Sequence, residues 1–103
     1  MKNKFYFLLT IICVTIFIQC TKANPEACLT VPATGKVGTS ITFTSCSLNA
    51  HHEEWDFGDT ATSTGATVTH AYNKAGTFTV KLTALNEDKS KSDSKTSSIT
   101  ISQ

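Results

Sequence analysis

Residues 53–60 read EEWDFGDT, and this stretch decides the fold. Its aromatic residues Trp55 and Phe57 are two positions apart, so on a strand their side chains lie on the same face. Gly58 follows directly and allows backbone conformations denied to other residues, while Asp59 can hydrogen-bond to its own turn. The stretch therefore predicts a strand with a buried aromatic face that ends in a tight turn.

Residues 56–58 also spell the Asp-Phe-Gly of protein kinases, where the Asp holds metal-bound phosphate. That role requires a glycine-rich loop, a strand lysine paired with a helical glutamate, and a catalytic-loop Asp and Asn. The sequence contains none of these elements, and a chain of 103 residues is too short to supply them. A kinase-like phosphate site is therefore excluded.

The two-residue spacing of apolar side chains recurs along the chain, between clusters of Gly, Asn, Asp and Ser. This period is typical of half-buried strands. An all-β, two-sheet sandwich is therefore predicted. The recurring sets are Leu29 and Val31; Ile41 and Phe43; Val68, His70 and Tyr72; Phe78, Val80 and Leu82; and Ile99 and Ile101.

Two adjacent segments near the C-terminus contrast sharply. Residues 76–85, GTFTVKLTAL, give the clearest strand, with a solvated face of threonines and Lys81. Residues 86–95, NEDKSKSDSK, are charged, serine-rich and without apolar side chains. We predict that they form a mobile hairpin loop before the last strand, in preference to an ion-binding acidic loop.

The N-terminus carries the features of an export signal. Lys2 and Lys4 precede residues 5–18, which form a run of fourteen residues without a charge. A membrane-spanning helix needs about 20 apolar residues, so this run fits the apolar region of a signal peptide better than an anchor. We expect residues 1–19 to be a lipoprotein-type signal peptide and the protein to be exported.

Cys20 ends the apolar run and resembles the lipid-modified cysteine of bacterial lipoproteins. The residue before such a cysteine is usually small, whereas Gln19 stands here. The alternative is ordinary cleavage after Ala23, which would leave a soluble protein that begins at Asn24. We favour lipidation of Cys20, with residues 20–25 as a polar tether and a location at the cell envelope or outer-membrane surface.

Two of the four cysteines remain available for a disulfide. Cys13 lies in the apolar run and Cys20 is the expected lipid site, so Cys28 and Cys46 are left in an oxidising compartment.

The positions of these two cysteines favour pairing. Cys28 lies one residue before Leu29 and Cys46 lies three residues after Phe43, so each is on the face opposite its strand's core residues. If the two strands are neighbours, both sulfur atoms project from the same outer side and can form a disulfide.

The charge pattern argues against nucleic-acid binding. Beyond Cys20 the chain has seven lysines and eight acidic residues, a net charge of −1, and it has no arginine. Clusters of Arg and Lys are what phosphate and nucleic-acid recognition require. No nucleic acid or cofactor is expected as a partner.

Three motifs in order along the chain resemble the PKD domain, an immunoglobulin-like module of about seven strands. The family pattern is Trp-Asp-Phe-Gly-Asp-Gly, then His-x-Tyr, then Gly-x-Phe/Tyr-x-Val. The resemblance covers residues 26–103, except that Thr60 replaces the last glycine of the first motif, so the turn there is expected to differ in shape. The matching residues are Trp55, Asp56, Phe57, Gly58 and Asp59; His70 and Tyr72; and Gly76, Phe78 and Val80.

The three histidines suggest a metal site, but their spacing does not support one. His51 and His52 are adjacent and so point to opposite faces of a strand. The sequence HHEEW also lacks the second histidine of the His-Glu-x-x-His zinc motif. His70 has inward parity, and in the family this histidine is structural, so we expect a hydrogen-bonded, partly buried imidazole. No metal or catalytic residue is assigned.

The resemblance implies a non-catalytic module that binds protein or carbohydrate or acts as a surface spacer. The alternative is a small secreted hydrolase or metal-dependent enzyme that uses the histidines and the carboxylates near residues 51–59. The sequence shows no exposed aromatic platform for a sugar, because Trp55, Tyr72 and most phenylalanines are expected in the core.

Overall fold

The computed structural model describes residues 23–103, which form eight strands and no helix. The predicted all-β fold is therefore confirmed. The strands are β1 (Leu29–Thr30), β2 (Thr34–Lys36), β3 (Ile41–Ser45), β4 (His52–Asp56), β5 (Thr62–Thr64), β6 (Thr67–His70), β7 (Gly76–Leu85) and β8 (Ser92–Ser102).

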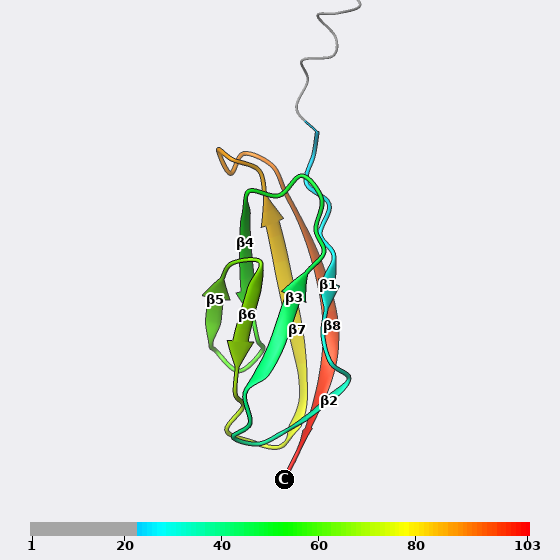
Figure 1. Cartoon of the computed structure of the whole chain (residues 1–103), viewed down its shortest axis with the longest axis vertical. Coiled ribbons are helices and arrows are strands. Elements are labelled where there is room, and N and C mark those ends of the chain that lie inside the picture. The colour runs from blue at the N-terminus through cyan, green and yellow to red at the C-terminus, as the bar shows by residue number, and fades with distance from the viewer. Residues whose placement is uncertain (1–22) are drawn as a thin grey trace, which may run out of the picture.

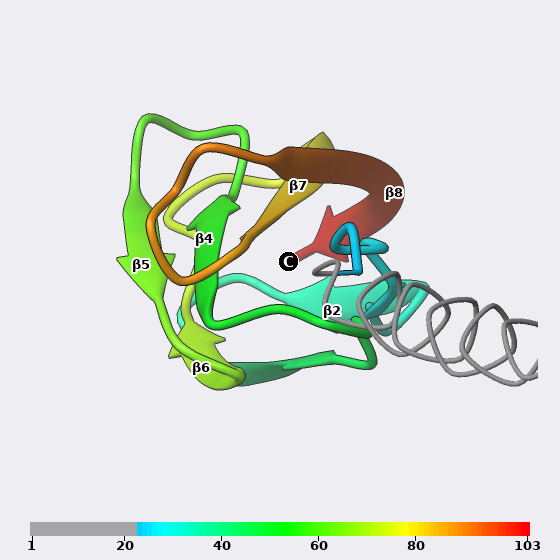
Figure 2. The same cartoon turned by 90° about the horizontal axis from the view of Figure 1, so that it is seen from above.

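The strands form two sheets that pack face to face (Figures 1 and 2). One sheet has the order β1-β3-β6 and the other the order β2-β8-β7-β4-β5. All neighbours are antiparallel except β2 and β8, which are parallel. This arrangement is an immunoglobulin-like sandwich.

The first predicted strand, with Leu29 and Val31, is short, and β2 was not predicted. Leu29 belongs to β1 in the smaller sheet, whereas Thr34 begins β2 in the larger one. Pro32 lies between them, and because proline has no N–H group it cannot continue a ladder of backbone hydrogen bonds. The edge strand β5 was not predicted, since its three residues are all polar.

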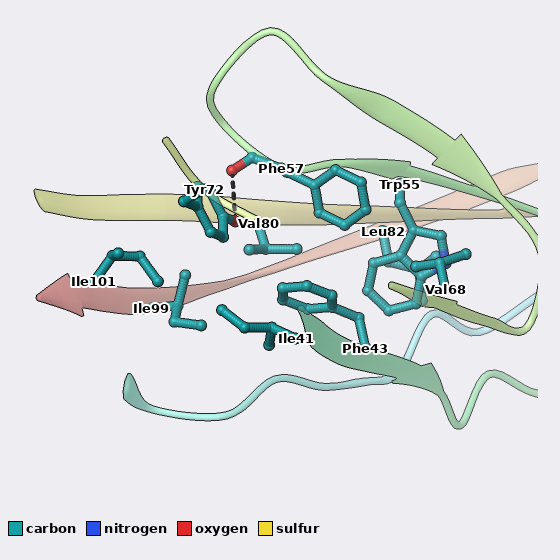
Figure 3. Close-up of a cluster of buried hydrophobic side chains, with 10 residues drawn as sticks. All are labelled: Ile41, Phe43, Trp55, Phe57, Val68, Tyr72, Val80, Leu82, Ile99 and Ile101. Atoms are coloured by element: carbon teal, nitrogen blue, oxygen red, sulfur yellow. Dashed lines mark hydrogen bonds between the residues drawn. The ribbon is translucent and has the colours of Figure 1, made fainter. Parts of the chain in front are cut away.

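The core lies between the two sheets and comes from every set of alternating residues beyond residue 40 (Figure 3). Its side chains are between 0 and 7% exposed, so the predicted parity is confirmed for these positions. Residues 23–103 form two sheets around a shared hydrophobic core, which is the organisation of a domain that folds as a unit. The core residues are Ile41, Phe43, Trp55, Phe57, Val68, Tyr72, Val80, Leu82, Ile99 and Ile101.

The predicted loop at residues 86–95 was wrong in extent. Strand β8 already begins at Ser92, which lies opposite Leu85 of β7, so the connection comprises residues 86–91 only. The first half of β8 lies at the sheet edge, because β2 reaches only its last three residues. Mostly exposed side chains there leave no apolar alternation that would identify a strand from sequence.

The two ends of the sandwich differ in what they carry (Figure 1). The described chain begins beside the β7–β8 hairpin, where the Ala27 N–H donates to Asp93 Oδ2 at 2.8 Å. We call this the tethered end. The opposite end, called the far end below, holds the Gly58–Thr60 turn, the connection from β6 to β7, and the C-terminus.

The predicted signal peptide, the expected lipid site Cys20 and the start of the tether lie outside the described residues. Within residues 23–103 there is no helix with the length and hydropathy to span a membrane.

Candidate functional site

The far end is built around the turn that follows β4. Gly58 has a φ of 82°, and a Cβ atom added there would lie 2.6 Å from the Thr79 carbonyl oxygen of β7. The position therefore requires glycine. The Gly58 N–H donates to Asp56 Oδ1 at 2.9 Å, so the outward-facing Asp56 closes the turn.

Thr60 also has a positive φ, 77°, at the position where the family pattern has glycine. Thr60 therefore keeps a left-handed backbone conformation that glycine favours. A β-branched residue in this region is rare and strained.

Asp59 connects this turn to strand β6. Its Oδ2 atom lies 2.7 Å from His70 Nε2, and its Oδ1 atom accepts from the Ala61 N–H at 3.2 Å. The side chains of Asp59 and His70 are 21% and 17% exposed. The His70 ring stacks on Phe57, with ring centroids 4.3 Å apart and an interplanar angle of 6°. His70 is thus a hydrogen-bonded, partly buried imidazole.

Tyr72 completes the aromatic cluster beneath the far end. Its ring is fully buried, and its hydroxyl donates to the Phe57 carbonyl oxygen at 2.9 Å (Figure 3). The Phe78 ring stacks on Tyr72 with centroids 4.4 Å apart. Burial, and then the negative charges of Asp59 and Asp56, raise the pKa of the Tyr72 phenol to about 12.

The remaining residues of the three motifs also have structural positions. Trp55 is 1% exposed, and its Nε1–H donates to the Gly65 carbonyl oxygen at 2.8 Å. Val80 is fully buried. Gly76 begins β7 with a φ of 148°.

Cys28 and Cys46 are joined by a disulfide near the tethered end. Cys28 directly precedes β1 and Cys46 directly follows β3, and the Cys46 N–H donates to the Cys28 carbonyl oxygen at 2.9 Å. Their Cα atoms are 4.8 Å apart. The two strands are neighbours, which is the condition that the sequence argument required.

His70 is not brought together with the other two histidines, whereas His51 and His52 line one hollow. His52 lies opposite Leu85 at the end of β7, and its Nε2 atom is 3.0 Å from the Glu87 carbonyl oxygen. His70 stacks on Phe57, five residues further along from His52, or roughly 17 Å at about 3.4 Å per residue. Residues 23–103 hold no group of three or more His, Cys, Asp or Glu side chains placed to bind a metal ion.

A hollow of about 330 Å³ opens at the far end. Its lining residues are Asp59, Thr60, Asn73, Lys74 and Phe78.

A second hollow, of about 490 Å³, lies towards the tethered end. The side chain of Glu53 lines it, and its Oε2 atom is buried without a hydrogen-bond partner in the described part of the chain. The other lining residues are His51, His52, Glu54, Thr64, Gly65, Ala66 and Lys89.

Sequence reasoning missed three features of the far-end hollow. Phe78 shares inward parity with Val80, yet it is only partly buried because it lies near the open end of the sandwich. Asn73 and Lys74 belong to no motif, and their position became visible only once β6 and β7 were placed. The one signal in the sequence was Thr60 in place of glycine.

The two-sheet topology, the buried tryptophan of β4 and the turn after it define an immunoglobulin-like sandwich. The family model of the PKD domain matches residues 22–101. The chain therefore belongs to the PKD domain family. PKD domains are non-catalytic binding or spacer modules, although related domains occur in enzymes.

Known proteins with similar sequences and structures agree with this family. A microbial collagenase of Vibrio alginolyticus is 38% identical over 69 residues, which is 62% of this chain and 8% of that protein. The PKD1 domain of the metalloprotease PrtV from Vibrio cholerae superposes with a TM-score of 0.67 at 29% identity, covering 79% of this chain and 100% of that one.

A third similar structure is described as showing the promiscuous specificity of carbohydrate-binding modules of the β-sandwich superfamily. It superposes with a TM-score of 0.74 at 26% identity, covering 81% of this chain and 36% of that one.

Proposed function

We propose that the chain is a non-catalytic lipoprotein of the cell envelope, whose PKD domain is held at the tethered end and binds its partner at the far end. The observation that carries this proposal is the separation of the two ends. Ala84 lies opposite Asp93, which accepts from Ala27 near the start of the domain. Phe78 of the far-end hollow is six residues from Ala84 along β7, about 20 Å at the usual rise of a strand.

The lipid anchor is supported by the order of features before the domain. Two lysines, an apolar run and Cys20 are followed by a short polar segment that leads into the tethered end. Two acyl chains on one cysteine suffice for stable anchoring, because each buried methylene contributes about 0.8 kcal/mol. An anchor at Cys20 would leave the far end directed away from the membrane.

A binding role, of protein or carbohydrate, is supported by the far-end hollow and by the similarity to carbohydrate-binding modules. The collagenase similarity covers 8% of that protein, so its peptidase activity is not assigned to this chain. The hydrolase alternative is weaker. His51 and His52 line one hollow with Glu53 and Glu54, but no group of three or more such side chains within residues 23–103 is placed to bind a metal ion, and His70 is held elsewhere by Asp59 and Phe57.

The test is expression of the full-length protein in bacteria with a radiolabelled fatty acid. Cys20→Ala removes the proposed lipid site, and Cys13→Ala is the matched control within the apolar run. The wild-type and Cys13→Ala proteins should carry label and sediment with membranes, whereas Cys20→Ala should be unlabelled. An unlabelled wild-type protein in the soluble fraction, beginning at Asn24, would contradict the proposal.

A further inference from the structure

We propose that the far-end hollow binds one ring of a neutral saccharide. This inference rests on the proposed binding function and names its site and ligand class. The hollow of about 330 Å³ is at the lower end of the range of small-ligand pockets, which runs from about 300 to 1,000 Å³. It therefore suits the end of a chain or a single ring better than a long, deeply buried ligand.

Phe78 supplies an aromatic surface to this hollow. The ring is partly buried and lines the hollow while it stacks on Tyr72 at 4.4 Å. Tyr72 is in turn fixed by its hydroxyl bond to the Phe57 carbonyl oxygen. The aromatic surface is therefore held by a rigid base, which lowers the cost of ordering on binding. The face of an aromatic ring carries partial negative charge, so the C–H groups on one face of a sugar ring can pack against it.

The rim of the hollow carries hydrogen-bonding groups that are not used within residues 23–103. The side chains of Thr60, Asn73 and Lys74 are exposed and have no partner in this part of the chain. Asp59 makes one bond through each oxygen, and a carboxylate has about four acceptor positions. Together these groups offer both donors and acceptors, which the neighbouring hydroxyls of a sugar require.

The charge of the rim selects a neutral ligand. Asp59 and Lys74 carry opposite charges and both line the hollow. With these charges balanced, no net charge favours a strongly anionic or cationic sugar.

The backbone at Thr60 is a second, independent observation. Thr60 holds a φ of 77° on the rim, where glycine would relieve the strain. Strain that persists beside a hollow points to a functional use of the side chain. We assign this function to the threonine hydroxyl, because glycine would keep the turn but could not supply a hydroxyl to the ligand.

The larger hollow near the tethered end fits a saccharide less well. No Phe, Tyr or Trp lines it, and Lys89 there already pairs with Glu54 at 3.9 Å.

The proposal is tested by NMR on ¹⁵N-labelled residues 23–103, titrated separately with cellohexaose, maltohexaose and chitohexaose. This segment forms two sheets around one core, and the PKD1 domain of PrtV, all of which the structural match covers, was crystallised as a domain. We expect at least one oligosaccharide to shift amide signals within residues 58–61 and 73–79.

Variants then assign the contacts. Phe78→Leu keeps an apolar side chain but loses the ring, and should weaken affinity by about tenfold. Asn73→Ala and Thr60→Gly should each weaken it by about threefold to tenfold. Asn24→Ala, a control at the tethered end whose side chain is exposed, should leave affinity unchanged. The amide spectrum of each variant shows whether it is folded, and if Phe78→Leu unfolds, Asn73→Ala decides the result.

Two results would overturn the site. If a saccharide shifts signals only on the outer sheet face or near the tethered end, the domain binds sugar but not in this hollow. If no saccharide shifts any signal, the ligand class is wrong. Neither result changes the outcome of fatty-acid labelling, which tests the anchored module separately.

Discussion

The two ends of the sandwich are held together by different chemistry. At the tethered end a covalent bond joins Cys28 to Cys46, close to where the described chain begins. At the far end, the residues pack and hydrogen-bond without a covalent link: His70 lies between Asp59 and the ring of Phe57. A small domain is only marginally stable. Here a disulfide stabilises one end, and packing and hydrogen bonds stabilise the other.

Polar residues close the connections at both ends of the sandwich. Between β7 and β8, Asn86 Oδ1 accepts from the Lys91 N–H at 2.9 Å, and Asp88 Oδ1 accepts from the Ser90 N–H at 3.0 Å. At the far end, Asp59 bonds to a histidine on another strand, in the other sheet. A carboxylate thus holds a distant segment at each end: Asp93 accepts from the Ala27 backbone at the tethered end, whereas Asp59 bonds to the His70 side chain at the far end.

The largest effect should come from removing the ring that supports the far end. Phe57 is 1% exposed and packs against Phe43 and His70. Phe57→Ala should lower the free energy of unfolding by about 3 to 5 kcal/mol. Urea denaturation measures this, with Leu48→Ala as control, since Leu48 is 59% exposed and its truncation should have little effect. Equal effects of the two variants would contradict the assignment of the core.

The next effect concerns the tethered end. The loop between Cys28 and Cys46 spans a sequence separation of 18, and opening it should cost about 3 kcal/mol by the chain-entropy estimate. Denaturation of the Cys28→Ala/Cys46→Ala variant should show this loss, with faster amide exchange concentrated at the tethered end. Mass spectrometry of the non-reduced exported protein should find the linked peptides. Two thiols that react with an alkylating reagent before reduction would refute the pairing.

A smaller loss is expected from Tyr72→Phe. The substitution leaves the Phe57 carbonyl oxygen without its buried donor, at a cost of about 1 to 2 kcal/mol.

The same tyrosine should make stability depend on pH. Its folded pKa, about 12, lies above the ordinary value of about 10. A raised pKa stabilises the fold below pH 10, and this contribution is lost as the pH rises through 12. Between pH 10 and 12 the wild type should therefore lose stability more steeply than Tyr72→Phe. Parallel curves would show that the phenol is not shifted.

The smallest effect, and the only gain, is expected at Thr60. Thr60→Gly relieves a positive φ and should raise the free energy of unfolding by up to about 1 kcal/mol. Thr62→Gly is the matched control, since Thr62 lies in β5 without a positive φ, and should lower it by about 0.5 to 1 kcal/mol. A loss of stability in both variants would show that Thr60 is unstrained.

The core could be predicted from sequence because alternation reports burial directly. Trp55, Phe57 and Val80 were all expected to face inward, and they do. The start of β8 could not be predicted, since its polar residues are exposed on an edge and carry no alternation. Backbone pairing with β7 determines the structure here, and the side-chain pattern gives no sign of this pairing.

The far-end hollow was less predictable for a different reason. Asn73, Lys74 and Thr60 lie on two separate connections, and only the packing of the sheets brings them together. The alternation of apolar residues predicted that Phe78 faces inward. It could not predict that the ring is partly exposed, because this depends on how near the residue lies to the open end of the sandwich.

The central claim is that the conspicuous polar residues of the far end stabilise the fold and do not perform catalysis. Within residues 23–103, each end has one pair of an acidic and a basic side chain that allows a direct test. Asp59 and His70 are 2.7 Å apart and mostly buried, whereas Glu54 and Lys89 are 3.9 Å apart, with side chains 50% and 55% exposed.

A double-mutant cycle on each pair, read by urea denaturation, measures the coupling between its two members. With alanine variants, the coupling of Asp59 and His70 should be about 1 to 2 kcal/mol in favour of folding. The coupling of Glu54 and Lys89 should be below about 0.5 kcal/mol, as for exposed ion pairs. Equal couplings at the two ends, or none between Asp59 and His70, would contradict the structural role assigned to the far-end residues.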